Sequence, residues 1–137
     1  MRKLVLAAAT ICLVGALAAG IFWVFVLPAL EWSSMVQNLV SHAQTLEITD
    51  YVRKVTIDRG HPQFQTVIDF ISRSRFVRKW DVVPPYPISH TLTFYLDNGQ
   101  RIRLSYDDGS SHLWWKGIYQ ASVDKEFVKV LDAILSS

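Results

Sequence analysis

The chain opens on an uninterrupted apolar stretch, Leu4 to Leu27, that contains no charged residue. A helix needs about 20 residues to cross a hydrocarbon core of about 30 Å, so this stretch is long enough to span a membrane. Arg2 and Lys3 precede it, whereas the first charge after it is Glu31. By the positive-inside rule, we expect a cytoplasmic amino terminus and the remaining chain outside. The pattern predicts a single-pass anchor over residues 1–30 that contacts the lipid bilayer through residues 4–27.

Two other interpretations of this segment exist. Ala16 and Ala18 form an A-x-A pattern, which is typical of signal-peptide cleavage. Cleavage after Ala18 would leave a mature terminus too apolar for water, so we favour an uncleaved anchor. Cys12 is the only cysteine and could carry a lipid, but the bulky Ile11 precedes it where lipoprotein signals have Gly or Ala. A single cysteine also excludes an intramolecular disulfide.

Residues 31–45 have the pattern of an amphipathic helix. Apolar residues recur at spacings of three and four: Trp32, Met35, Val36, Leu39, Val40 and Ala43. This stripe can pack on its own domain, on the membrane surface or on a second copy, and we favour the first because six positions are few for a coiled coil. Trp23 and Trp32 bracket the membrane exit and suit an interfacial belt, or else they simply pack. A single domain then occupies residues 46–137.

The first part of this domain reads as a strand followed by a helix. Residues 46–57 are rich in β-branched and aromatic types and predict a strand that ends before Asp58. Pro62 suits the first position of a helix that reaches about Ser74. Its expected buried stripe is Phe64, Val67, Ile68 and Ile71. Residues 81–87 contain three prolines and predict a stiff extended connector.

A hairpin is predicted for residues 89–96 and 100–106. A two-residue turn would place apolar residues opposite arginines, whereas a three-residue loop over residues 97–99 pairs Phe94 with Ile102 and Leu92 with Leu104. The second register keeps apolar side chains on one face. It requires Gly99 in the left-handed conformation, as in a type I turn followed by a bulge.

A further strand is predicted from His112 to Tyr119, with alternating faces. Leu113, Trp115 and Tyr119 should point inward, and His112, Trp114, Lys116 and Ile118 outward. Ser122 suits the N-cap of a final helix with the apolar stripe Phe127, Val130, Leu131 and Ile134. The fold class is therefore α+β: a two-layer domain in which helices cover one face of a short antiparallel meander.

Charge and motif content exclude several functions. Apart from Arg2 and Lys3, twelve basic residues balance twelve acidic ones, so the domain lacks the basic footprint that phosphate binding requires, and no nucleic acid partner is expected. The four histidines show no metal-ligand spacing, and we expect no metal or cofactor. No nucleophile motif indicates a catalytic residue. An enzyme or metal-dependent hydrolase would have to use His90, His112 and Asp107 or Asp108.

Two surfaces are candidates for binding. The outward sheet face combines exposed aromatic and basic side chains, a composition typical of interaction hot spots. Its residues are Thr91, Thr93, Tyr95, Arg101, Arg103, His112, Trp114 and Lys116. Alternatively, the 32–43 helix covers this face. The second surface is the basic cluster Arg73, Arg75, Arg78 and Lys79, which suits an anionic headgroup or an acidic polymer, or merely complements a helix dipole.

These observations predict a non-catalytic interaction module anchored in the cell membrane and facing the cell envelope. Its partner would be an envelope protein or a glycan. The small enzyme described above is one alternative, and a ligand sensor or an immunity-type inhibitor is another. We expect replacement of Trp114 to leave folding intact, and replacement of Trp115 to destabilise the domain.

Overall fold

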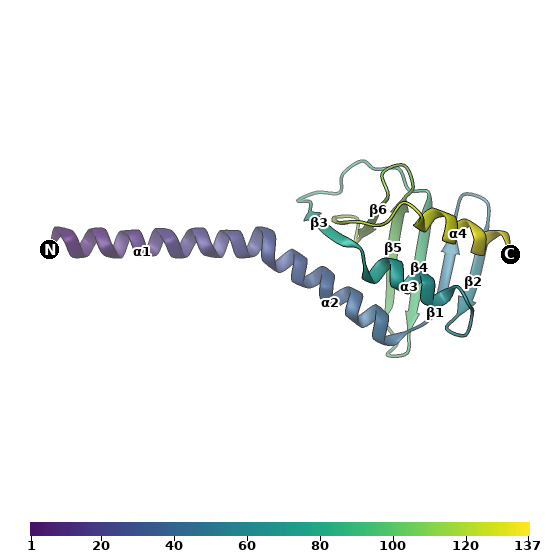
Figure 1. Cartoon of the computed structure of the whole chain (residues 1–137). Helices are drawn as coiled ribbons and strands as arrows, with labels where there is room; N and C mark the ends of the chain where they lie inside the picture. The colour runs from purple at the N-terminus through teal and green to yellow at the C-terminus, as the bar shows by residue number, and fades with distance from the viewer.

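The computed structural model describes all 137 residues and shows one long helix that leads into an α+β domain (Figure 1). The helix runs over Arg2–His42 as three consecutive segments, α1 (Arg2–Ile21), η1 (Phe22–Val26) and α2 (Leu27–His42). It is the one helix long and apolar enough to cross a membrane. No residue of α1 is buried, and α1 stands clear of the domain in Figure 1.

The helix bends where α1 gives way to α2 (Figure 1). Pro28 lies in the first turn of α2, and the five residues before Leu27 form the π-helical segment η1. Proline has no N–H to donate to the carbonyl four residues earlier, and its ring clashes with that carbonyl. The backbone widens by a π turn and continues, so the helix is bent without being interrupted.

The domain contains a single seven-stranded sheet in which every neighbouring pair is antiparallel. The strand order is β2-β1-β4-β5-β6-β7-β3. The strands are β1 (Ala43–Thr49), β2 (Lys54–Asp58), β3 (Arg75–Lys79), β4 (His90–Leu96), β5 (Arg101–Asp107), β6 (His112–Trp115) and β7 (Tyr119–Ser122). Helices α3 (Phe64–Ser72) and α4 (Phe127–Ser136) complete the fold. Strands β4 to β7 form the predicted meander, and β1, β2 and β3 extend it at both edges.

The core lies between one face of the sheet and the helices α2, α3 and α4. Every second residue of a strand points to that face, and residues at these positions such as Leu46, Phe94 and Leu104 are fully buried. The predicted stripe of α3 is buried, as is most of the stripe of α4. Leu39 of α2 is fully buried in the same cluster. The apolar stripe of α2 therefore packs on its own domain, which was the favoured alternative.

Polar contacts also hold the end of α2 against the sheet. The His42 carbonyl accepts the N–H of Asp97 at 2.9 Å, and the His42 ring lies 2.8 Å from the Asp97 carboxylate. One turn earlier, Asn38 donates to the Gln100 side chain at 2.7 Å. Trp32 is buried and lies near Phe76 of β3, so of the two alternatives for this residue, packing in the core is the one that the structure shows.

The β4–β5 hairpin confirms the predicted register. Phe94 pairs with Ile102 and Leu92 with Leu104, and Gly99 has φ +83°. A residue with a β-carbon is strained in that backbone conformation, which explains why a glycine occupies this position of the loop. The irregular segment between β3 and β4 includes the predicted extended connector over residues 81–87.

The predicted single strand over residues 46–57 was wrong, because the structure forms a hairpin there. Strands β1 and β2 are joined by a turn in which the Asp50 carboxylate accepts the N–H groups of Val52 at 2.8 Å and Arg53 at 2.6 Å. Such side-chain acceptance of backbone donors reverses the chain without a glycine. Tyr51 and Val52 are exposed at the tip.

The predicted strand from His112 to Tyr119 is likewise a hairpin of β6 and β7. The chain turns at Lys116 and Gly117, both with positive φ, at 55° and 75°. Ser122 belongs to β7 and does not cap the final helix, whose N-cap is Glu126. The basic cluster also differs from the prediction, because residues 75–79 form edge strand β3 instead of a helix end. Pro62 precedes α3, which begins at Phe64.

We predict that Leu39→Ala destabilises the domain by about 2–5 kcal/mol, because it leaves a cavity in the core. Leu13→Ala, the same change on exposed α1, should leave the free energy of unfolding unchanged. Urea denaturation of the full chain in detergent measures both. Equal stability of the two variants would show that α2 is not part of the core.

Candidate functional site

The face of the sheet opposite the helices carries the predicted binding residues. In the β4–β5 hairpin, Tyr95 pairs with Arg101 and Thr93 with Arg103, so these side chains lie side by side on that face. They line a shallow depression of about 240 Å³. Its lining residues are Glu47, Thr49, Thr91, Thr93, Tyr95, Arg101 and Arg103.

A second depression of about 400 Å³ adjoins the first. Its lining residues are Arg101, Arg103, Ser105, Trp114, Trp115, Lys116 and Gly117. Because Arg101 and Arg103 line both hollows, the two form one continuous surface, which we call the arginine face. Seven of the eight residues predicted for this face therefore line one surface: Thr91, Thr93, Tyr95, Arg101, Arg103, Trp114 and Lys116.

The arginine face carries uncompensated positive charge. Arg101, Arg103 and Lys116 make no ion pair in the chain, whereas Glu47, the one carboxylate that lines the face, lies 3.6 Å from Lys54. Lys116 extends over the ring of Trp115, with its ammonium 4.5 Å from the ring centroid. Unpaired guanidinium groups beside aromatic rings can bind carboxylate, phosphate or sulfate groups.

Trp114 is buried, which corrects the expectation that it is exposed. Its side chain points to the outer face as predicted, but only 4% of the residue is exposed. Tyr86 stacks on it at 4.1 Å between ring centroids, and Trp80 lies 6.5 Å away. The cover is thus the 80–87 segment and not the 32–43 helix, which packs on the other face. Trp115, expected to be buried, packs against the core and is partly exposed.

The Trp114 indole N–H is the one buried side-chain donor without a hydrogen-bond partner. The neighbouring Trp80 differs, because its indole N–H donates to the Gln120 side chain at 2.9 Å. An unpaired buried donor costs about 1–3 kcal/mol. No sequence pattern predicts this missing hydrogen-bond partner, since the burial of Trp114 depends on how residues 80–87 fold back over β6.

His112 adjoins the arginine face without lining it, since its ring centroid is 6.5 Å from that of Trp114. Its ring Nδ1 is 2.8 Å from the Ser110 hydroxyl, which donates to the Asp107 carboxylate, and the ring lines neither depression. These contacts order the β5–β6 turn.

The residues of the alternative enzyme site do not meet. His90 pairs with Tyr106 on the helix-covered face, whereas Asp107 and His112 pair on the opposite face. No group of three or more His, Cys, Asp or Glu side chains is placed to hold a metal ion. The constellation of His90, His112 and Asp107 or Asp108 was wrong because it ignored the alternation of faces between neighbouring positions.

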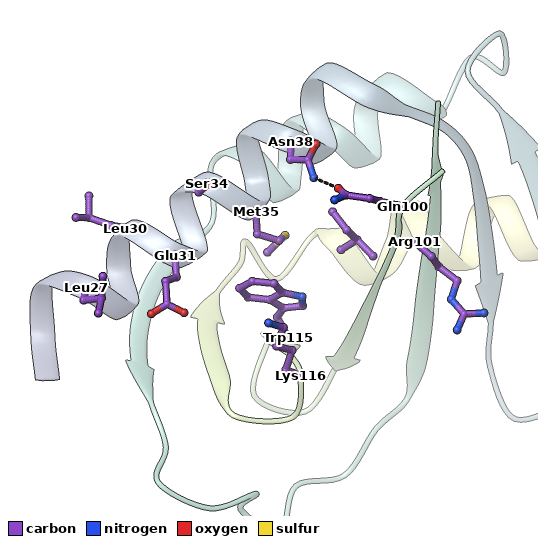
Figure 2. A pocket seen from close by; sticks show the side chains of 11 residues that line it. Leu27, Leu30, Glu31, Ser34, Met35, Asn38, Gln100, Arg101, Trp115 and Lys116 are labelled. Carbon is purple, nitrogen blue, oxygen red and sulfur yellow. Dashed lines mark hydrogen bonds between the residues drawn. The ribbon is translucent and has the colours of Figure 1, made fainter. Parts of the chain in front are cut away.

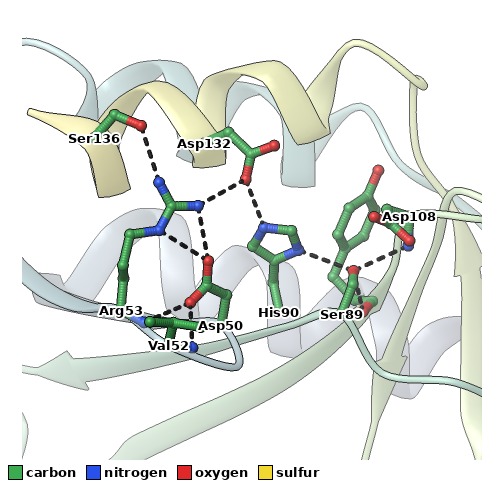
Figure 3. A network of polar contacts seen from close by, with 9 residues as sticks. Asp50, Val52, Arg53, Ser89, His90, Asp108, Asp132 and Ser136 are labelled. Atoms are coloured by element: carbon green, nitrogen blue, oxygen red, sulfur yellow. Dashed lines mark hydrogen bonds and ion pairs between the residues drawn. The ribbon is translucent and has the colours of Figure 1, made fainter.

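His90 instead joins a polar network that sequence reasoning missed (Figure 3). The residue is 5% exposed, with Nε2 2.9 Å from the Asp132 carboxylate of α4 and Nδ1 2.8 Å from the Ser89 hydroxyl. Ser89 also donates to the Tyr106 carbonyl and accepts the Asp108 N–H. None of the five principal depressions is lined by these residues. The contact between His90 and Asp132 ties α4 to β4.

Arg53 extends this network to the β1–β2 turn. Its guanidinium donates to the Asp50 carboxylate at 2.8 Å and to the Ser136 hydroxyl at 2.9 Å. The pKa of Asp50 is lowered to about 2, chiefly by the backbone N–H groups of Arg53 and Val52 and then by the Arg53 side chain.

The predicted basic cluster is divided along β3. Arg73 and Arg75 lie at one end, where they line a hollow with Asp124. At the other end, the Arg78 guanidinium stacks 3.9 Å above the Trp80 ring, and the Lys79 ammonium lies 5.0 Å from the Tyr119 ring centroid. The four cations therefore do not form one patch.

Comparison with known proteins leaves this geometry as the basis for function. No protein-family model matches the chain, and neither the curated proteins nor the solved structures give a match. The fold and the site define the class of protein: a small antiparallel α+β domain led by one apolar helix of membrane-spanning length.

We predict that Trp114→Ala costs about 3–5 kcal/mol of stability, because the ring is buried under Tyr86 and Trp80. Trp114→Phe should lose much less, since it removes the unpaired N–H while keeping an aromatic ring. Trp80→Phe is the matched control, because it sacrifices a formed hydrogen bond. Urea denaturation measures all three, and wild-type stability of Trp114→Ala would contradict the burial.

We predict that Asp50→Asn lowers stability at neutral pH and that the deficit shrinks as the pH falls. The folded-state pKa of about 2 lies below the ordinary aspartate pKa of 3.8, so the carboxylate stabilises the fold above about pH 4. That contribution disappears between about pH 4 and pH 2. Denaturation midpoints of the wild type and of Asp50→Asn at several pH values measure the deficit. A deficit that stays constant from neutral pH to pH 2 would exclude the expected role of Asp50.

Proposed function

We propose that this protein is a single-pass, membrane-anchored, non-catalytic binding module whose domain faces the cell envelope. The observation that carries the proposal is the division of one helix between two environments. Every residue of α1 is exposed and nearly all are apolar, while Trp32 and Leu39 of the same helix are buried in the domain core. Exposure of so large an apolar surface is unfavourable in water and favourable in the hydrocarbon core of a bilayer.

The continuity of the helix favours an uncleaved anchor. A cut after Ala18 would fall inside α1 and leave Ile21 to Val26 exposed at a new terminus in water. Lipid around these residues removes that cost. Arg2 and Lys3 at the start of the helix favour a cytoplasmic amino terminus, which places the domain outside.

The arginine face supports binding of an anionic partner. Arg101 and Arg103 are unpaired, adjacent on one sheet face and next to Tyr95, so they suit the carboxylates of an envelope protein or of an acidic glycan. The tether would raise the effective concentration of this face at the membrane. A catalytic role is less well supported, because the Ser89, His90 and Asp132 contact adjoins none of the principal depressions.

The anchor and its orientation are tested by cysteine labelling in spheroplasts. In a Cys12→Ala background, Ser137→Cys should react with a membrane-impermeant maleimide before lysis, whereas a cysteine added at the amino terminus should react only after lysis. The protein should also stay in the membrane pellet after carbonate washing. Recovery in the supernatant, or a first residue of Ala19, would refute the anchor.

The binding face is tested with two anionic polymers, polyglutamate and polygalacturonate, on the chain in nanodiscs. We expect Arg101→Glu with Arg103→Glu to weaken binding by roughly tenfold, because two attractive charges become repulsive. Arg75→Glu with Arg78→Glu is the charge-matched control on β3. Unchanged binding by the first pair, or an equal loss in the second, would remove the arginine face as the site.

A further inference from the structure

The largest groove of the domain lies between α2 and the β5–β6 hairpin (Figure 2). Its volume is about 710 Å³. Leu27 and Leu30 line the end from which α1 departs, Trp115 lies beneath α2, and Lys116 and Arg101 add cations farther along (Figure 2). Its walls thus change from apolar to basic along its length.

The depth of this groove relative to a membrane follows from the helix itself. Leu27 is the last residue of the apolar stretch and also lines the groove. Glu31, one turn later and about 6 Å farther along the axis, accepts a hydrogen bond from the Tyr119 hydroxyl at the start of β7. The headgroup layer is about 5–7 Å thick on each side of the hydrocarbon core. The apolar end of the groove therefore lies at headgroup depth whenever residues 4–27 span the bilayer.

The charges of the groove suit an anion. Lys116 and Arg101 make no ion pair in the chain. The Lys116 ammonium lies 4.5 Å from the Trp115 ring centroid, and the Arg101 side chain points away from α2 in Figure 2. Glu31 is the only carboxylate that lines the groove. It already accepts the Tyr119 hydroxyl, and Lys79 lies on the Tyr119 ring. The groove therefore carries two unpaired cations and one carboxylate, and that carboxylate is hydrogen-bonded to Tyr119.

We propose that this groove binds one anionic phospholipid from the leaflet in which α1 ends. The acyl chains would enter the hydrocarbon beside Leu27 and η1, Leu30 would contact the glycerol region, and the headgroup phosphate would contact Lys116 and Arg101. The sequence of apolar and cationic walls, read outward from the membrane, matches the polarity of a lipid. This proposal rests on the proposed anchor, because without it no lipid reaches the groove.

The test uses the full chain in phosphatidylcholine nanodiscs that contain a minority of phosphatidylglycerol. Native mass spectrometry counts the phosphatidylglycerol molecules that stay on the protein after release from the disc. The wild type should retain one. Ser34→Trp fills the groove from α2 and should abolish retention, whereas Ser33→Trp, the same change on the neighbouring residue outside the groove, should not.

Charge is tested in the same assay. Lys116→Glu should lower retention by roughly fivefold or more, since one cation near a membrane contributes about 1 kcal/mol. Lys125→Glu, an equal charge change at an exposed residue outside the groove, should have no such effect. Equal retention by Ser34→Trp and wild type would overturn the groove proposal alone. A chain that fails to enter nanodiscs would overturn the anchor and the groove proposal together.

Discussion

The packing of the α2 stripe into the domain core is the interaction on which the rest of the structure depends. It joins an apolar helix of membrane-spanning length to a folded sheet without a flexible linker. Buried side chains such as Leu39 contribute about 1.5–3 kcal/mol each, and the bonds of Asn38 and His42 hold the helix end to the β4–β5 turn. The position of the domain relative to α1 is therefore fixed by its own core.

The same packing leaves the opposite face of the sheet free of helices. Residues 80–87 cover that face only around Trp114, so Arg101 and Arg103 remain unpaired and accessible. Arg101 also lines the groove beside α2, which brings both proposed binding surfaces together on strand β5. An anchored domain of this design would present cations both to its own membrane and to partners in the envelope.

The sequence predicted those features that follow from local periodicity. Alternation identified the β4–β5 register and the outward direction of Trp114, and spacing identified the stripes of α2 and α3. Periodicity did not predict the turn at Asp50, because a carboxylate that accepts backbone N–H groups needs no glycine or proline to interrupt a β-rich segment. It did not predict the turn at Lys116 either, because a lysine rarely adopts positive φ. Burial of Trp114 and the pairing of His90 with Asp132 depend on contacts between distant segments, which periodicity does not encode.

One continuous helix joins the apolar segment to the domain core. Spin labels on the native Cys12 and on Gln37→Cys, in nanodiscs, test it by electron-electron distance measurement. A continuous helix places these two positions about 37 Å apart, slightly less with the bend at Pro28, and we expect one narrow distance distribution near that value. A broad distribution centred well below it would show a flexible joint and contradict the account.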